Sequence, residues 1–188
     1  MGESPQRDRR RTPGVGRVTV DPSEPSPAAT GRYWAFISYS HRDERQTARL
    51  HRQLESYPIP KRLVEAATSQ GQTIPKRLFP VFRDRDELGG APDLSARIQD
   101  ALRDSRFLIV VCSPHSVGSR WVDEEIKAFT RLGRESRVLA YIVDGEPNAS
   151  DDPRTTSLEC FPEGLRFRMG LDGVITSERT EPNAAHAR

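Results

Sequence analysis

The stretch SRWVDEEIKAF, residues 119–129, places three consecutive carboxylates just after a tryptophan. An α-helix turns by about 100° per residue, so a helix here spreads the three acids over different faces. Asp123 and Glu124 then face solvent, whereas Glu125 follows Trp121 by four positions and shares its face at the border of the core. The stripe facing the core consists of Val122, Ile126 and Phe129. A half-buried carboxylate beside an aromatic ring can hold a sugar or stabilise developing positive charge, which makes Glu125 the candidate chemical group.

A purely structural interpretation of these acids stays open. Ser119 is a natural N-cap for a helix that begins at this point. Carboxylates in the first turns of a helix suit the positive end of its dipole, whatever else they do. The W-x-x-x-E spacing also arises by chance on helices, so the spacing alone does not decide the question.

The other reactive residue types show no catalytic or metal-binding spacing. Cys112 and Cys160 have no CxxC spacing, and we interpret them as a buried thiol and a loop thiol in a reducing compartment, with no metal site. His41 stands alone in SYSHRDE and is more typical of a surface residue or helix cap than of a base. The loop RDRDELGGAP (83–92) has the composition of a solvated turn, and the GxGxxG and GK[ST] nucleotide patterns are absent.

Four short apolar runs have the length and composition of strands. They are WAFISYS (34–40), FPVF (79–82), FLIVVC (107–112) and VLAYIV (138–143). Helical spacing between them, at 43–57, 93–105 and 120–132, predicts an open parallel α/β sheet with right-handed crossovers. The helix positions expected to face the sheet are Thr47, Leu50, Leu54 and Tyr57 in the first helix and Leu94, Ile98, Ala101 and Leu102 in the second.

A parallel sheet of this kind binds ligands at the carboxyl ends of its strands. The loops after Ser40, Phe82, Cys112 and Val143 are therefore the ones to examine. A phosphoacceptor receiver has a similar architecture, but the third run here ends in CSPHS, without the aspartate that a receiver requires.

Composition excludes several classes of protein. The formal net charge of +2 comes from nearly balanced acids and bases, which argues against nucleic acid as a partner. No apolar segment is long enough to span a bilayer, and no signal-peptide pattern begins the chain, so we expect a cytoplasmic protein without a membrane partner. Residues 1–31 are rich in Pro, Gly, Ser and Arg and predict a disordered leader.

Four segments in unbroken order together resemble a bacterial Toll/interleukin-1 receptor (TIR) domain over residues 32–168. They are YWAFISYSHRD, FPVFRDRDELGGAPDLSARIQDALRDSRFLIVVCSP, SRWVDEEIKAF and RVLAYIVDGEP. The resemblance implies a flavodoxin-like open sheet of five parallel strands with helices on both faces. We assign the TIR domain to residues 32–178 and a tail or linker to 179–188, with the fifth strand from GLRFRM or GVIT.

The resemblance further implies hydrolysis of NAD⁺ at the nicotinamide–ribose bond, with nicotinamide and linear or cyclic ADP-ribose as products. In this family the glutamate of W-x-x-x-E is the catalytic acid, which here is Glu125 with Trp121 as its partner. The family pattern places three further groups of residues around the substrate. They are Phe36, Ser38, Tyr39 and Ser40 in the floor of the pocket; Phe82, Arg83, Asp84 and Leu88 in the BB loop; and Ser113 and Ser119 near the ribose. No metal or cofactor is implied, because NAD⁺ is the substrate.

The same resemblance leaves a second function open, that of a non-catalytic adaptor that binds other TIR domains. In both cases the BB loop, residues 83–92, is the expected contact in a homo-oligomer. The family usually closes with an amphipathic helix that is missing here, so the chain is expected to be the front of a longer protein. Such proteins often act in anti-phage defence.

Overall fold

A computed structural model describes residues 31–64, 74–83, 92–170 and 172–187. The predicted leader therefore lies outside the described residues, apart from residue 31. In the described ranges, no helix has both the length and the apolar character needed to cross a bilayer.

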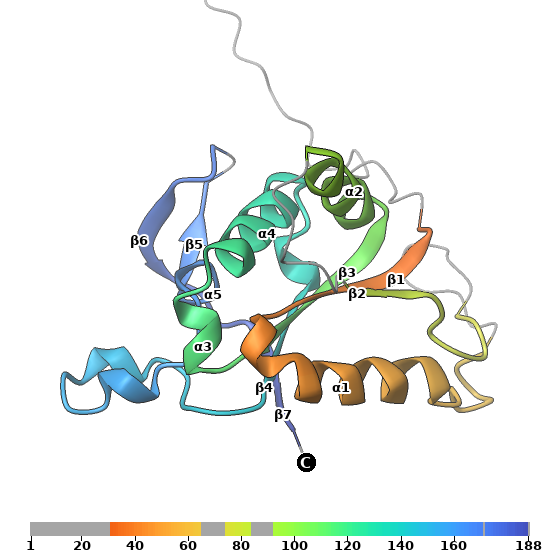
Figure 1. Ribbon diagram of the computed structural model, residues 1–188, viewed down its shortest axis with the longest axis horizontal. Coiled ribbons are helices and arrows are strands. Elements are labelled where there is room, and N and C mark those ends of the chain that lie inside the picture. The colour runs from red at the N-terminus through yellow and green to blue at the C-terminus, as the bar shows by residue number, and fades with distance from the viewer. Residues whose placement is uncertain (1–30, 65–73, 84–91, 171, 188) are drawn as a thin grey trace, which may run out of the picture.

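The centre of the molecule is a five-stranded sheet in the order β2-β1-β3-β4-β7 (Figure 1). Its strands are β1 (Tyr33–Ser38), β2 (Val81–Arg83), β3 (Ser105–Cys112), β4 (Val138–Ile142) and β7 (Asn183–His186). Every pairing in this sheet is parallel. This confirms the predicted flavodoxin-like α/β fold, in which the four strands predicted from apolar runs are β1 to β4.

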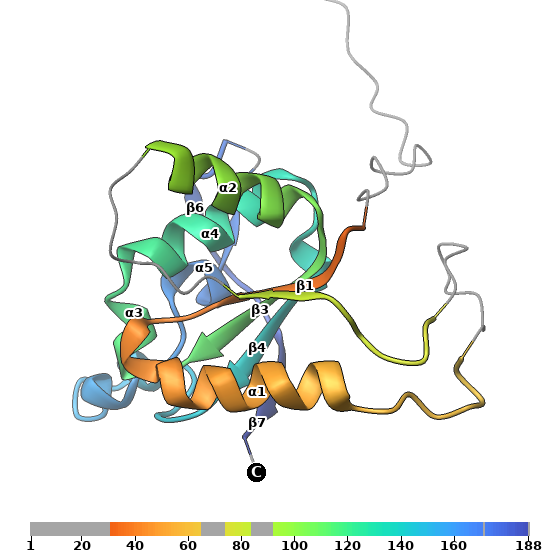
Figure 2. The ribbon, with the colours of Figure 1, turned by 45° about the vertical axis from the view of Figure 1, so that its right-hand side comes forward.

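Helices cover the sheet from both sides (Figures 1 and 2). The longer helices are α1 (Glu44–Ser56), α2 (Pro92–Arg103) and α4 (Arg120–Arg131). The short ones are α3 (Pro114–Val117), α5 (Glu163–Arg166) and the 3₁₀ turns η1 (His41–Asp43), η2 (Glu135–Arg137), η3 (Ala149–Asp151) and η4 (Thr156–Leu158). In both views α2 and α4 lie on one side of the sheet and α1 lies on the other.

Strand alternation divides the core into two clusters, one on each face of the sheet. Phe36, Leu108 and Val110 pack with the buried stripe of α4, whereas Ile37 and Val111 pack on the side of α1. Side chains at successive positions of a strand point to opposite faces, so a strand covered on both sides must be apolar throughout. Each fully buried aliphatic side chain contributes about 1.5–3 kcal/mol to the free energy of folding.

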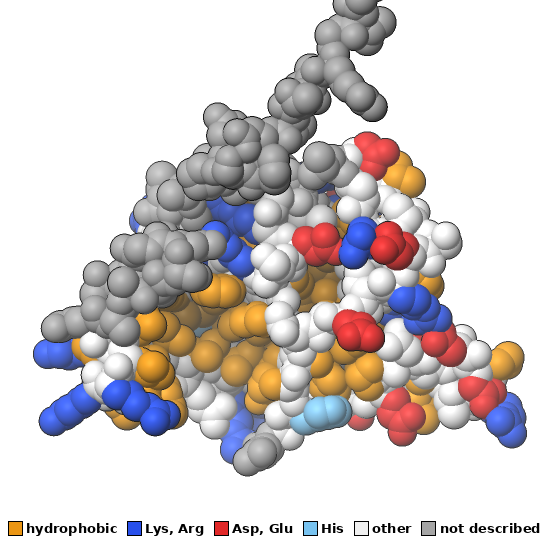
Figure 3. Space-filling view, turned by 180° about the vertical axis from the view of Figure 1, so that it is seen from behind, with side chains coloured by type: hydrophobic (Ala, Val, Ile, Leu, Met, Phe, Trp, Pro, Cys, Tyr) orange, Lys and Arg blue, Asp and Glu red, His pale blue; other side chains and the backbone are white. Residues whose placement is uncertain are grey.

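The margin of the α1 face is only partly covered. Apolar side chains at its margin are only partly buried; they are Trp34, Leu54, Leu139, Tyr141 and Val143. Seen from behind, apolar side chains gather in a hollow of the surface (Figure 3). Tyr57, predicted to face the sheet, lies just past the end of α1 and is exposed, because the helix ends at Ser56.

The fifth strand is not where the sequence predicts it. Neither GLRFRM nor GVIT joins the sheet; they form the antiparallel hairpin of β5 (Phe167–Met169) and β6 (Ile175–Arg179). The fifth strand is β7, which lies in the stretch read as a tail or linker. All its side chains are exposed, so it has no apolar signature, and backbone pairing with β4 holds it at the sheet edge.

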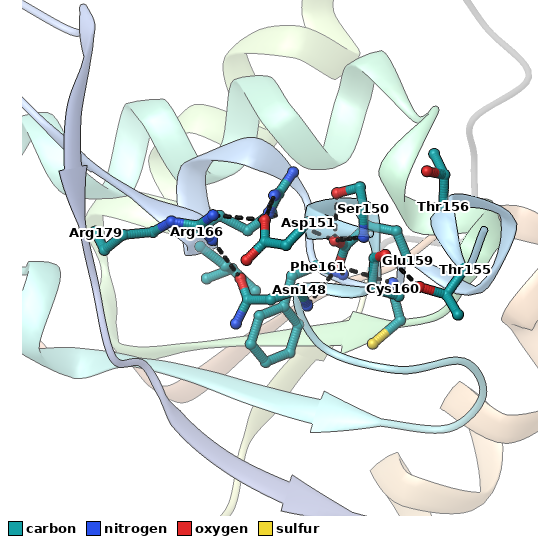
Figure 4. A network of polar contacts seen from close by, with 12 residues as sticks. Asn148, Ser150, Asp151, Thr155, Thr156, Glu159, Cys160, Phe161, Arg166 and Arg179 are labelled. Carbon is teal, nitrogen blue, oxygen red and sulfur yellow. Dashed lines mark hydrogen bonds and ion pairs between the residues drawn. The ribbon is translucent and has the colours of Figure 1, made fainter. Parts of the chain in front are cut away.

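Residues 144–161 form a lobe that contains η3 and η4 and projects beside α3 (Figure 1). At its centre lies Glu159, with 4% of its surface exposed. Its carboxylate accepts hydrogen bonds from the backbone N–H groups of Asn148, Ser150, Cys160 and Phe161 and from the Ser150 hydroxyl (Figure 4). Arg166 adds an ion pair at 3.5 Å. A single buried carboxylate thus ties both ends of the lobe together.

Candidate functional site

A hollow of about 490 Å³ lies at the carboxyl edge of the sheet, between the chain segments that follow β1 and β3. Its described lining consists of Ser40, His41, Arg42, Pro114, His115, Gly118, Ser119, Arg120 and Trp121. This is the edge at which an open parallel sheet places its ligands, and the volume falls in the range of small-molecule sites. Ser40, Ser119 and Trp121 are the residues predicted from sequence that meet in it.

A buried hydrogen bond joins the two walls of the hollow. The Ser113 hydroxyl, directly after β3, donates to Oδ2 of Asp43 over 2.6 Å, and Asp43 is only 3% exposed. Ser113 also caps α3, because its Oγ accepts from the backbone N–H of His115. The bond thereby fixes η1, which carries His41 and Arg42, against the start of α3.

Sequence reasoning missed Asp43, His41 and Arg42 as site residues. Asp43 stands at the N-cap position of α1 and is most simply read as a cap, yet its side chain makes no capping hydrogen bond. The bond to Ser113 spans 70 residues, so no local pattern could have indicated it. Ser113 itself was predicted near the ribose, but it is fully buried behind the hollow.

The 144–161 lobe supports the other side of α3. Ser116 Oγ lies 3.2 Å from the carbonyl oxygen of Cys160, and Gly145 packs so closely on Pro114 and Leu158 that a Cβ there would clash with the Leu158 backbone. Gly145 has φ of +81°, which also favours glycine. The lobe and its central Glu159 therefore set the position of the Pro114 wall.

Helix α4 presents Trp121 and Glu125 as the sequence predicts. Ser119 caps the helix by accepting from the N–H of Val122 over 3.5 Å, and the predicted stripe faces the core, fully buried. Trp121 is 53% exposed, Glu125 is half-buried and Glu124 is exposed. Asp123 does not face solvent as predicted; it is half-buried and forms an ion pair with Lys127. The last residue in the described lining of the hollow is Trp121, and Glu125 follows four residues later, about 6 Å along the helix axis.

The residues predicted for the floor of the pocket do not all share one face. Phe36 is buried and stacks on Phe82, with ring centroids 5.2 Å apart. Ser38 is buried on the same face of β1, and its hydroxyl has no hydrogen-bond partner among the described residues. Tyr39 packs instead on the α1 side, where its hydroxyl donates to Glu44 over 2.6 Å.

The structure describes only part of the predicted BB loop. Arg83, at the end of β2, forms an ion pair of 2.8 Å with Glu44, the carboxylate that also accepts from Tyr39. Asp84 and Leu88 lie outside the described residues. That this loop covers the site stays a prediction from the family resemblance.

The two thiols are unsuited to covalent catalysis. Cys112 and Cys160 are both buried and unbonded. Burial raises the pKa of Cys160 to about 12. Burial also raises the pKa of Cys112 well above its ordinary value, and the neighbouring Cys160 adds to this effect. Both thiols stay protonated at neutral pH, and a thiol is a poor nucleophile compared with a thiolate.

Comparison with known proteins identifies the family. The family model described as "Thoeris protein ThsB, TIR-like domain" matches residues 36–148. The chain belongs to this TIR-like family. It is also 30% identical over 142 residues to a protein of an Actinoplanes species called "NAD(+) hydrolase ApTIR", a match that covers 74% of the TIR-like chain and 18% of that relative. The chain thus spans less than a fifth of the relative's length.

One solved structure with TIR domains is also similar to this TIR-like domain. It is that of the activated Roq1 resistosome, which recognises the pathogen effector XopQ. The sequence identity is 20%, the TM-score is 0.43, and the match covers 66% of each chain.

Proposed function

We propose that this TIR-like domain hydrolyses NAD⁺ at the bond between nicotinamide and ribose. The observation that carries the proposal is the placement of Glu125 on α4, half-buried and one turn beyond the exposed Trp121, beside a hollow at the carboxyl edge of the sheet. The relative named as an NAD(+) hydrolase supports the choice of substrate.

The chemistry of this bond suits a carboxylate that is not a strong acid. The C1′–N bond breaks with its electron pair going to the pyridinium nitrogen, so nicotinamide leaves as a neutral molecule. Positive charge then develops on the ribose, as in other glycoside cleavages. Glu125 stabilises that charge in the transition state, and water attacks C1′ and releases its proton. Trp121 offers a flat apolar surface beside the reacting sugar.

A matched pair of neighbouring glutamates tests the proposal. Glu125→Gln keeps the shape of the side chain and removes its charge, and we expect it to lower kcat for nicotinamide release by about 10²–10³-fold. Glu124→Gln makes the same change one residue earlier on the exposed face and is expected to keep near wild-type activity. Nicotinamide is measured by chromatography after incubation of concentrated protein with NAD⁺.

Each result separates the possible readings of the site. Full activity in Glu125→Gln would remove Glu125 from the mechanism. A wild-type protein that stays inert even when clustered on a surface would favour the non-catalytic adaptor instead. Self-assembly through residues 83–92, a cytoplasmic location and a role in anti-phage defence stay predictions from the family resemblance.

A further inference from the structure

We propose that Arg42 and Arg120 bind the diphosphate of the dinucleotide and so make the site specific for substrates that carry it. This inference rests on the proposed hydrolysis of NAD⁺ and names a part of the same site. Arg42 lies on η1 after β1, and Arg120 is the first residue of α4. The two arginines reach the hollow from opposite walls.

The charge of the hollow is one-sided. Its described lining includes two arginines and two histidines, whereas no carboxylate contributes to it. Among the residues that the structure describes, Arg42 and Arg120 have no ion-pair or hydrogen-bond partner. Other arginines of the domain are engaged, such as Arg83 with Glu44 and Arg179 with Asp151. A concave surface with unpaired guanidinium groups attracts an anion, and guanidinium geometry suits phosphate oxygens.

Arg120 also occupies an unfavourable position for helix stability. It is the first residue of a twelve-residue helix, where the dipole favours carboxylates and disfavours cations. A residue that breaks a local rule without an evident structural gain often serves the function of the site. An anion in the hollow would offset the repulsion, because it would meet both the guanidinium and the positive end of α4.

The placement matches the covalent structure of the substrate. In NAD⁺ the diphosphate is joined to the nicotinamide ribose through a single CH₂–O link. A diphosphate held between Arg42 and Arg120 leaves the ribose next to Trp121. Its C1′ then lies within reach of Glu125, about one helical turn further along α4. The arginines are thus positioning residues that hold the substrate for the carboxylate.

Steady-state kinetics with truncated substrates test this specificity. For the wild type we expect kcat/KM to fall in the order NAD⁺, nicotinamide mononucleotide, nicotinamide riboside, which carry two, one and no phosphates. Arg42→Gln and Arg120→Gln should each raise KM for NAD⁺ about tenfold, with a smaller effect on kcat. The differences in kcat/KM between the three substrates should become smaller in both variants. Lysine at either position should restore part of the loss, since it keeps the charge.

The matched control is Arg45→Gln. Arg45 is an exposed arginine in the first turn of α1 and does not contribute to the described lining of the hollow. Arg45→Gln should leave KM for NAD⁺ unchanged, which would show that the rise in KM of the other two variants is not a general effect of net charge. All three side chains changed in these experiments are exposed, and circular dichroism verifies the fold of each variant.

A binding measurement separates this inference from the proposed function. ADP and adenosine are titrated by calorimetry into wild type and into the two arginine variants. ADP is expected to bind at least tenfold more tightly than adenosine to the wild type, and Arg42→Gln and Arg120→Gln should abolish that difference. If NAD⁺ is cleaved but neither KM nor ADP affinity changes in the two arginine variants, the proposed diphosphate site is wrong and the proposed activity is supported. If ADP binding depends on them in a protein that never cleaves NAD⁺, the diphosphate site stands and the activity is wrong.

Discussion

At the scale of single residues, helix phase correctly placed Glu124 in solvent and Glu125 at the border of the core. It did not separate Asp123 from Glu125, because Asp123 is half-buried as well and forms an ion pair with Lys127. Ser119 caps the helix, and the predicted stripe is buried. Tertiary contacts were not accessible in this way. Asp43 and Ser113 belong to different loops, and their bond exists only because the parallel strands β1 and β3 are neighbours that end at the same edge.

The Asp43–Ser113 bond can be tested by a double-mutant cycle. Asp43→Ala and Ser113→Ala each remove the charged hydrogen bond, which lies in a buried setting. We expect each variant to unfold about 1.5–3 kcal/mol more easily and the double variant to lose less than the sum. Urea denaturation followed by tryptophan fluorescence gives these free energies. Strictly additive losses would show that the two side chains do not stabilise each other.

At the scale of elements, apolar runs predicted β1 to β4, most clearly the inner strand β3, because burial on both faces demands continuous apolar sequence. β7 was not predicted, for the opposite reason. An edge strand with exposed side chains needs only backbone partners, and its sequence NAAH has no apolar periodicity. The 144–161 lobe was also invisible from sequence. The lobe depends on the buried carboxylate of Glu159, which accepts hydrogen bonds from donors at both ends of the lobe (Figure 4). No pattern of residue types predicts such a network.

The lobe gives the domain a specific dependence on pH. Burial by itself would raise the pKa of Glu159, but hydrogen bonds from Ser150 and Phe161 and the charge of Arg166 outweigh it and lower the pKa below its ordinary value. A carboxylate with a lowered pKa in the folded state stabilises the fold above its unfolded pKa of about 4.3. That contribution is lost as pH falls from there through the folded pKa.

Glu159→Gln is therefore expected to unfold about 2–4 kcal/mol more easily than wild type at pH 7, since its NH₂ group faces backbone donors. The gap should shrink as pH falls from the unfolded pKa of about 4.3 through the lower folded pKa of Glu159, because the wild type then protonates and loses the same interactions. Urea denaturation across pH 3–7 measures it. Glu146→Gln, an exposed glutamate of the same lobe, is the control and should follow wild type. A gap that is constant over this range would show that the Glu159 charge is not what stabilises the lobe.

At the scale of the whole molecule, two surfaces formed by the described residues combine apolar side chains with exposure to solvent. One is the hollow with the exposed Trp121 at its rim, and the other is the apolar margin of the α1 face (Figure 3). Exposed apolar surface is typical of protein contact sites. A domain whose site residues lie at an open rim gains water exclusion and additional contacts when a second copy covers them, which strengthens electrostatic stabilisation of a transition state.

Activity should therefore depend on protein concentration. If the assembled form is the active one, mass action makes the specific activity rise as concentration increases, and we expect at least a tenfold rise over a range of about 100-fold. Initial rates of nicotinamide release at saturating NAD⁺, measured together with the molar mass from light scattering, test this dependence. Glu125→Gln should show the same rise in mass without the rise in rate, which separates assembly from chemistry. A specific activity that stays constant while the protein is monomeric throughout would mean that one copy holds a complete site, with Trp121 and Glu125 sufficient beside the hollow.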